Sequence, residues 1–155
     1  MPSLVSIDLF DAIGLFLFLA GFIIGLGAVT VIDFHGFLGR KSSYWTEATT
    51  RTHKVTKPMI WTGIVLAIIG GAIFYRAEAF AGIPMLHALA ALMLIGNGYF
   101  LSFKVSPYLL EKERDGRAGE ILSTSWQRKI AAGLIVSDIG WWGSLALLVI
   151  YLLAR

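Results

Sequence analysis

The chain has 155 residues, of which 57% are hydrophobic and only 15% are charged. A soluble domain of this length could not remove so much apolar surface from water, so the composition favours a protein that lies in a lipid bilayer. The formal net charge of +3 is small, and the basic residues lie between apolar runs, which argues against a nucleic-acid partner. The absence of cysteine excludes disulfides, zinc sites with cysteine ligands and iron–sulfur clusters.

Four apolar segments follow one another along the chain, each long enough to cross a hydrocarbon layer of ~30 Å. Pro58 and Pro84 would lie in the first turns of the second and third helices, where a missing N–H group costs least. The segments predict an all-α, polytopic membrane protein, a four-transmembrane-helix bundle that forms one domain, 1–155. We expect its spans at about 9–32, 58–75, 84–103 and 130–153.

The Lys and Arg residues set the expected orientation. Eleven of them lie in the first and third loops, whereas only Arg76 and Arg155 lie on the opposite side. The positive-inside rule therefore places loops one and three in the cytoplasm and both termini outside, in the inner membrane of the cell. The N-terminal stretch lacks a basic region and carries Asp8 and Asp11, so we expect a retained helix rather than a cleaved signal peptide.

The two halves of the chain are similar to each other. When 20–41 is aligned with 91–112, glycines fall on glycines and Asp33 falls on Lys104. This register predicts two repeated helical hairpins, related by an axis along the membrane normal. It would also bring Asp33 and Lys104 to equivalent positions, where they could form an ion pair.

The histidines are the candidate metal ligands. His87 opens the third span, where a neutral imidazole suits haem iron or copper, or else hydrogen-bonds a carbonyl group or water. His35 is a second candidate metal ligand toward the opposite end. A metal site that includes it would need the first loop to fold back, because the chain has no HxxxH spacing. His53, beside Lys54 in a basic loop, is interpreted as a surface residue.

Two further polar side chains lie within the predicted spans. Asp138 falls about two turns into the fourth span, and Asn97 lies in the third. A carboxylate at such a depth is costly and usually faces the bundle interior, where it relays protons or cations, tunes a cofactor, or fixes packing through a hydrogen bond. We expect Asp138 and Asn97 to contribute, together with His87, to a cofactor-binding site.

The segments IPMLHALAALMLIGNGYFLSFK and THKVTKPMIWTGIVLAIIGGAIF resemble a superfamily of small four-helix membrane proteins. Its members include the copper-resistance D domain and the haem-dependent membrane protoporphyrinogen oxidase of bacteria. The pattern that matches is the Leu86-His87 pair at a helix start; a further Leu-His pair opens the oxidase's first helix, where this chain has Phe10-Asp11. The resemblance implies the four-helix fold and His87 as a possible ligand.

The sequence therefore predicts an integral membrane protein associated with haem b or a metal such as copper, in redox reactions or cofactor handling. Whether it is an enzyme stays open. The alternative is a non-enzymatic membrane module that transports an ion or metabolite or serves as a subunit of a larger membrane complex. Asp138 and the GxxxG pair Gly21 and Gly25 suit this alternative equally well. The expected partners are the lipid bilayer and either further copies of the chain or a larger complex.

Overall fold

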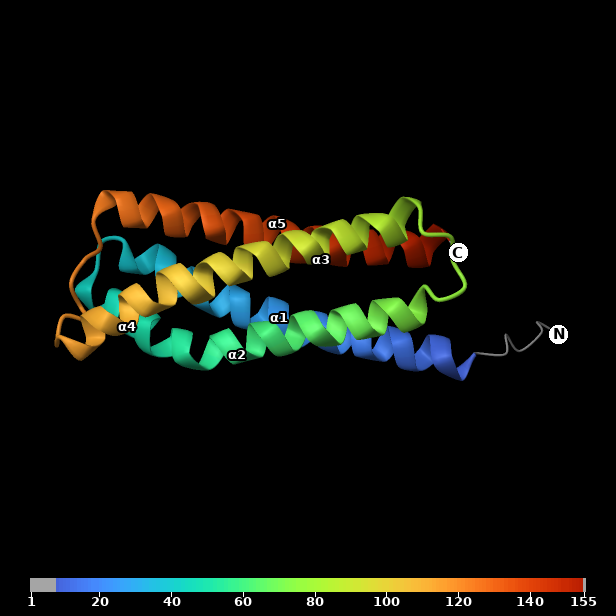
Figure 1. The fold of residues 1–155 in the computed structure, drawn as a ribbon, viewed down its shortest axis with the longest axis horizontal. Helices are drawn as coiled ribbons and strands as arrows, with labels where there is room; N and C mark the ends of the chain where they lie inside the picture. Colours follow the sequence, from blue (N-terminus) through green and yellow to red (C-terminus); the bar gives the residue numbers. More distant parts are fainter. Residues whose placement is uncertain (1–7, 155) are drawn as a thin grey trace.

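The computed structural model describes residues 8–154 (Figure 1). Within that range every regular element is helical, and three of them join end to end as one long helix, Gly82–Arg114. The elements are α1 Leu9–Gly39, α2 Ser43–Phe74, α3 Gly82–Phe100, the π-helix η1 Leu101–Val105, α4 Ser106–Arg114 and α5 Thr124–Ala154. Four helices are thus long and apolar enough to cross a membrane, which confirms the predicted four-helix membrane bundle.

The second helix is longer than the sequence analysis predicted. α2 begins at Ser43, so most of the predicted first loop is helical and Pro58 lies inside the helix rather than in its first turn. The Ser42 side chain caps this start by accepting a hydrogen bond from the Trp45 N–H group at 3.4 Å. The prediction for Pro84 is confirmed, because it lies in the first turn of α3.

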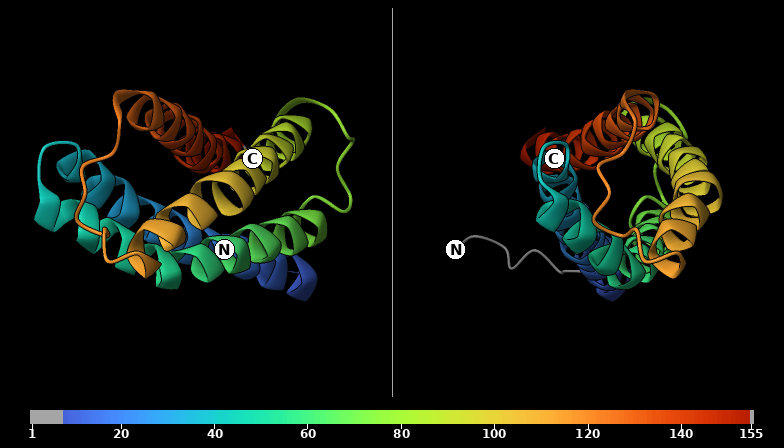
Figure 2. Two further views of the ribbon diagram at one scale, coloured as in Figure 1. Left: turned by 60° about the vertical axis from the view of Figure 1, so that its left-hand side comes forward. Right: turned by 90° about the vertical axis from the view of Figure 1, so that its left-hand side faces the viewer.

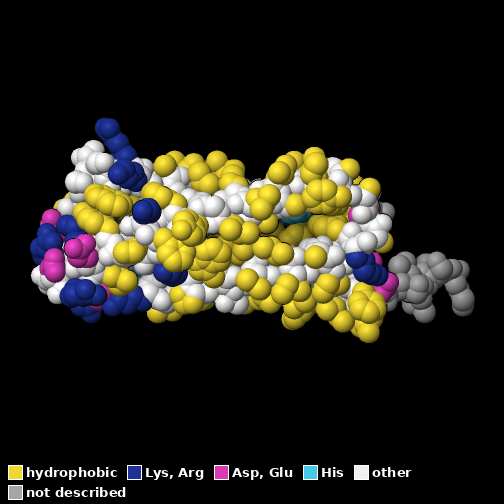
Figure 3. Space-filling model, viewed as in Figure 1, with side chains coloured by type: hydrophobic (Ala, Val, Ile, Leu, Met, Phe, Trp, Pro, Cys, Tyr) yellow, Lys and Arg dark blue, Asp and Glu magenta, His cyan; other side chains and the backbone are white. Residues whose placement is uncertain are grey.

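Both ends of the described chain lie at one end of the bundle, which we call the termini end (Figure 1). The turn between α1 and α2 and the segment between α4 and α5 lie at the other, which we call the basic end. Figure 3 shows Lys and Arg side chains gathered there, with hydrophobic side chains over most of the middle. This apolar middle suits contact with lipid tails. At the termini end, Arg76 forms ion pairs with Asp8 and Asp11.

Helices α1 and α2 form a closely packed hairpin (Figure 2). Gly21 and Gly25 of α1 face Gly63 of α2. A Cβ atom added to Gly63 would lie 2.5 Å from the Gly25 Cα, and one added to Gly21 would lie 2.7 Å from the Gly63 carbonyl oxygen. Gly14 and Gly70 bring the same two backbones equally close nearer the termini end. Small residues at GxxxG spacing thus allow the two helix backbones to approach closely.

The apolar core lies where this hairpin meets α3 and α5. Phe22 of α1 packs edge to face on Trp141 of α5, with ring centroids 6.0 Å apart. Ile64 of α2 and Leu94 of α3 belong to the same buried cluster. On either side of this contact, toward the two ends of the bundle, the structure contains a cavity.

Candidate binding cavities

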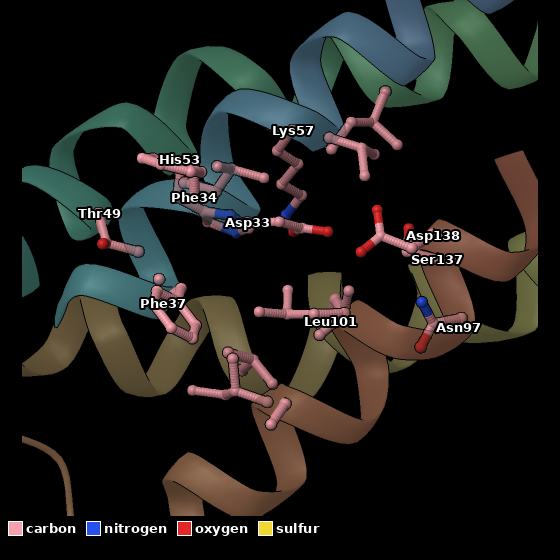
Figure 4. A pocket seen from close by; sticks show the side chains of 18 of the residues that line it. Asp33, Phe34, Phe37, Thr49, His53, Lys57, Asn97, Leu101, Ser137 and Asp138 are labelled. Atoms are coloured by element: carbon pink, nitrogen blue, oxygen red, sulfur yellow. The ribbon is translucent and has the colours of Figure 1, made fainter. Parts of the chain in front are cut away.

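The larger cavity lies toward the basic end and has a volume of about 770 Å³. This size is within the ~300–1,000 Å³ range of small-molecule sites, and most of the lining is apolar. Polar side chains enter it from all four spanning helices: Asp33 from α1, His53 and Lys57 from α2, Asn97 from α3, and Ser137 and Asp138 from α5 (Figure 4). We call it the aspartate cavity.

The carboxyl groups of Asp33 and Asp138 point into the same space from opposite sides of this cavity (Figure 4). Neither carboxylate forms a salt bridge with any residue in 8–154. Asp33 Oδ2 is buried and has no hydrogen-bond partner among the described residues. Two like charges in apolar surroundings are costly unless a proton or a cation neutralises one of them.

The predicted ion pair between Asp33 and Lys104 is wrong. Lys104 lies within the π-helix η1 and is exposed, and it forms no salt bridge with Asp33. A π-helical turn contains more residues than an α-helical one, so it rotates the residues within it relative to the α-helical register. The internal alignment assumed an unbroken α-helix and could not include this rotation.

Lys57 brings a positive charge to the cavity and is anchored on η1. Its Nζ atom donates to the Ser102 carbonyl oxygen at 3.3 Å, and Trp61 Nε1 donates to the Ser102 hydroxyl oxygen at 3.0 Å. The carbonyl of Ser102 belongs to the π-helical turn, a feature that occurs often at functional sites. Lys57 and Trp61 therefore hold α2 against the irregular part of the long helix.

The charges inside the aspartate cavity do not balance. Asp33 and Asp138 contribute two negative charges and Lys57 contributes one positive charge, which leaves −1 when both carboxylates are ionised and His53 is neutral. Arg40 also lines the cavity, but the residue is exposed, so solvent screens its charge. One proton or one monovalent cation would make the interior neutral.

His53 is a site residue that the sequence analysis missed. It was interpreted as a surface residue, but α2 extends through it, and its imidazole lines the aspartate cavity with Nε2 buried and without a hydrogen-bond partner in the described chain. The signal that could have found it is the four-residue spacing to Lys57, because residues four apart share a helix face. That signal becomes visible only once the segment is recognised as helical.

Two of the three predicted cofactor-site residues come together. Asn97 and Asp138 both line the aspartate cavity, and Asn97 Nδ2 also donates to the Gly133 carbonyl oxygen of α5 at 2.8 Å. The side chain of Asn97 thus joins α3 to α5 at the cavity wall. His35 does not line this cavity; its ring packs on Trp45, with centroids 5.2 Å apart.

The third predicted residue, His87, lies in a second cavity toward the termini end, with a volume of about 510 Å³. His87 Nε2 lies 2.8 Å from the Ser144 carbonyl oxygen, which can only accept, so Nε2 carries the proton and donates it. Nδ1 then accepts a hydrogen bond from the Tyr75 hydroxyl group at 3.2 Å. We call this the histidine cavity. Metal binding by His87 would require one of these two bonds to break.

The predicted metal ligands His87 and His35 therefore lie in separate parts of the bundle. Among residues 8–154, no three His, Asp or Glu side chains come together in a group that could hold a metal ion. The buried imidazole nitrogen best placed for a ligand in the larger cavity belongs to His53.

Comparison with known protein families, curated proteins and solved structures gives no match for this chain. The resemblance to the copper-resistance D and protoporphyrinogen oxidase superfamily thus stays a prediction.

Proposed function

We propose that this membrane protein is a non-enzymatic module that binds a monocationic, largely apolar small molecule in the aspartate cavity. The observation that carries the proposal is the facing pair of Asp33 and Asp138 in a mainly apolar space, where Lys57 is the one compensating interior cation among the described residues. A ligand with one positive charge would neutralise that space. We place the basic end in the cytoplasm, as the positive-inside rule predicts.

The size and walls of the cavity support an organic cation over a bare ion. A volume of about 770 Å³ far exceeds what one metal ion occupies. The apolar walls would contact the hydrocarbon part of the ligand, and aromatic rings over a desolvated cation contribute ~2 kcal/mol or more each. The aromatic residues that line the cavity are Phe34, Phe37, Trp61, Trp141 and Trp142.

The test is the binding of tetraphenylphosphonium, a permanent apolar monocation, to the purified protein in detergent. Quenching of tryptophan fluorescence is a suitable signal, because Trp61 and Trp141 line the cavity. We expect saturable binding that Asp138→Asn weakens about 10- to 100-fold, since a charged contact is worth ~1.5–3 kcal/mol. Asp115→Asn, which removes an exposed carboxylate outside both cavities, is the matched control. Equal affinity in wild type and Asp138→Asn would contradict the proposal.

A second candidate function is haem b binding in the same cavity, and the observation that favours it is the unpartnered Nε2 atom of His53. The large apolar space fits a porphyrin ring in size and character, with His53 in place of His87 as the candidate axial ligand. Haem bound there would supply one-electron redox chemistry. An absorption spectrum of protein from haem-supplemented membranes, before and after dithionite, tests this. A Soret band that His53→Ala removes and His87→Ala retains would support it; a flat spectrum would contradict it.

A further inference from the structure

The aspartate cavity and the histidine cavity share three lining residues: Ile64 of α2, Leu94 of α3 and Trp141 of α5. All three are buried, and Trp141 is only 1% exposed. We call these three residues the septum, because they separate the two spaces. The Trp141 ring is pressed so closely against α1 that a Cβ atom added to Gly25 would overlap it. The septum is therefore closed by side chains from three helices against the backbone of the fourth.

One face of α5 runs past both cavities and the septum. Ser137, Trp141, Ser144 and Leu148 are buried at spacings of four, three and four residues, which places them on a single helix face. Ser137 and the adjacent Asp138 line the aspartate cavity, Trp141 belongs to the septum, and Ser144 lines the histidine cavity. With a rise of ~1.5 Å per residue, Ser137 and Ser144 are separated by only about 11 Å along the helix axis.

The histidine cavity has the chemistry of a second cation-binding site. Glu78 lines it toward the termini end, where its carboxylate accepts a hydrogen bond from the Tyr151 hydroxyl group at 2.6 Å. The Nδ1 atom of His87 accepts a hydrogen bond from Tyr75, so the imidazole that lines this cavity is the neutral tautomer. The rings of Phe18 and Phe22 supply aromatic walls.

We propose that the two cavities are the two halves of one pathway across the membrane, and that the septum is its gate. The inference rests on the proposed function, since it assigns the same monocation a route past Trp141 from the aspartate cavity to the histidine cavity. Trp141 Nε1 is buried and has no hydrogen-bond partner among the described residues. A buried donor without a partner is unfavourable. Water or ligand that enters the septum would accept a hydrogen bond from Trp141 Nε1, which favours opening.

The test measures entry of ethidium, a monocation, into lipid vesicles that contain DNA and the reconstituted protein. Protein-free vesicles give the background. We expect the wild type to exceed that background, Asp138→Asn to abolish the excess, and Trp141→Ala to raise the entry rate about tenfold, which corresponds to ~1.4 kcal/mol of barrier. Trp126→Ala is the matched control on the same helix, because Trp126 stacks on Tyr108 outside both cavities. An ethidium entry rate in Trp141→Ala equal to that of the wild type would contradict the proposal that the septum is a gate.

A second measurement uses the absence of native cysteines. Thr49→Cys lies in the aspartate cavity and Ala88→Cys in the histidine cavity. In oriented vesicles we expect an impermeant, positively charged thiol reagent to modify each cysteine much faster from one side than from the other, with opposite preferred sides for the two positions. Adding Trp141→Ala should open both positions to both sides. Modification from one side only in the presence of Trp141→Ala would contradict a continuous pathway.

The two proposals can fail separately. If the folded wild-type protein does not bind tetraphenylphosphonium, both the proposed function and the pathway are wrong. Tetraphenylphosphonium binding by the wild type, together with unchanged ethidium entry and one-sided thiol modification in Trp141→Ala, would contradict the pathway alone.

Discussion

The two halves of the bundle are packed by different means. Between α1 and α2, glycines bring backbone against backbone: a Cβ atom added to Gly63 would meet the Gly25 backbone at 2.5 Å. Between α3 and α5, glycines receive side chains instead, as where a Cβ atom on Gly140 would lie 2.7 Å from Leu94 Cδ2. Side chains can change rotamer and backbones cannot, so the first pair is a rigid platform and the second can adjust. The septum residues Leu94 and Trp141 belong to the adjustable pair.

The rigid pair should be the more sensitive to a single added methyl group. Gly63→Ala places a Cβ atom against the Gly25 backbone, which has no rotamer to change, so we expect a loss of about 3 kcal/mol, at the upper end for overpacking. Thermal unfolding in detergent measures it. In Gly27→Ala the new Cβ atom meets nothing within 4 Å, and we expect a gain of about 0.5–1 kcal/mol from helix propensity. Equal melting temperatures for the two variants would contradict close contact between the α1 and α2 backbones at Gly63.

A glycine-to-alanine substitution between α3 and α5 should lower the free energy of unfolding by less than one between α1 and α2. Gly140→Ala brings a Cβ atom against the side chains of Leu94 and Met93, which can move aside, so we expect a loss of about 1 kcal/mol. Gly143→Ala is the control on the same helix, since its Cβ atom would meet nothing within 4 Å. A Gly140→Ala variant as unstable as Gly63→Ala would show that the two interfaces are equally rigid.

Loss of a hydrogen bond across the histidine cavity should lower the free energy of unfolding by as much as Gly140→Ala or by less. Tyr75→Phe removes the hydroxyl group that donates to His87 Nδ1, and a buried acceptor without a donor costs ~1 kcal/mol or slightly more. The melting temperature of Tyr75→Phe should fall, and adding His87→Phe should cause little further loss through this bond. Strictly additive losses in the double variant would show that the two side chains do not act through one bond.

The smallest expected effect is at the basic end. Glu120 lies 2.8 Å from Lys112 Nζ, and this hydrogen bond, with the charges of Lys112 and Arg117, holds the pKa of Glu120 below its ordinary value of 4.5. A pKa that is lower in the folded state contributes stability above the unfolded value, and that stability is lost as the pH falls through the folded value. Glu120→Gln should therefore lower the melting temperature slightly at neutral pH and not at strongly acidic pH. A difference that persists unchanged in acid would contradict this ion pair.

The fold was largely predictable because long apolar runs and GxxxG spacing can each be recognised within one short stretch of the sequence. Asp138 and Asn97 were found for a related reason, since polar groups inside an apolar span must turn toward the bundle interior. His53 was missed because the segment before Pro58 is polar and rich in threonine, a weak helix former. Its helix depends partly on distant contacts, such as the hydrogen bond from Ser43 Oγ to the Gly119 carbonyl oxygen at 2.5 Å, which no local pattern reveals.

A matched pair of ions tests whether the aspartate cavity prefers positive charge. Tetraphenylphosphonium and tetraphenylborate have nearly the same shape and opposite charge, so the ratio of their dissociation constants isolates the electrostatic part of binding. In the wild type we expect the cation to bind at least about tenfold more tightly, a difference of ~1.4 kcal/mol, and Asp138→Asn to remove most of that preference. The same ratio in the wild type and in Asp138→Asn would contradict cation recognition by the aspartate pair.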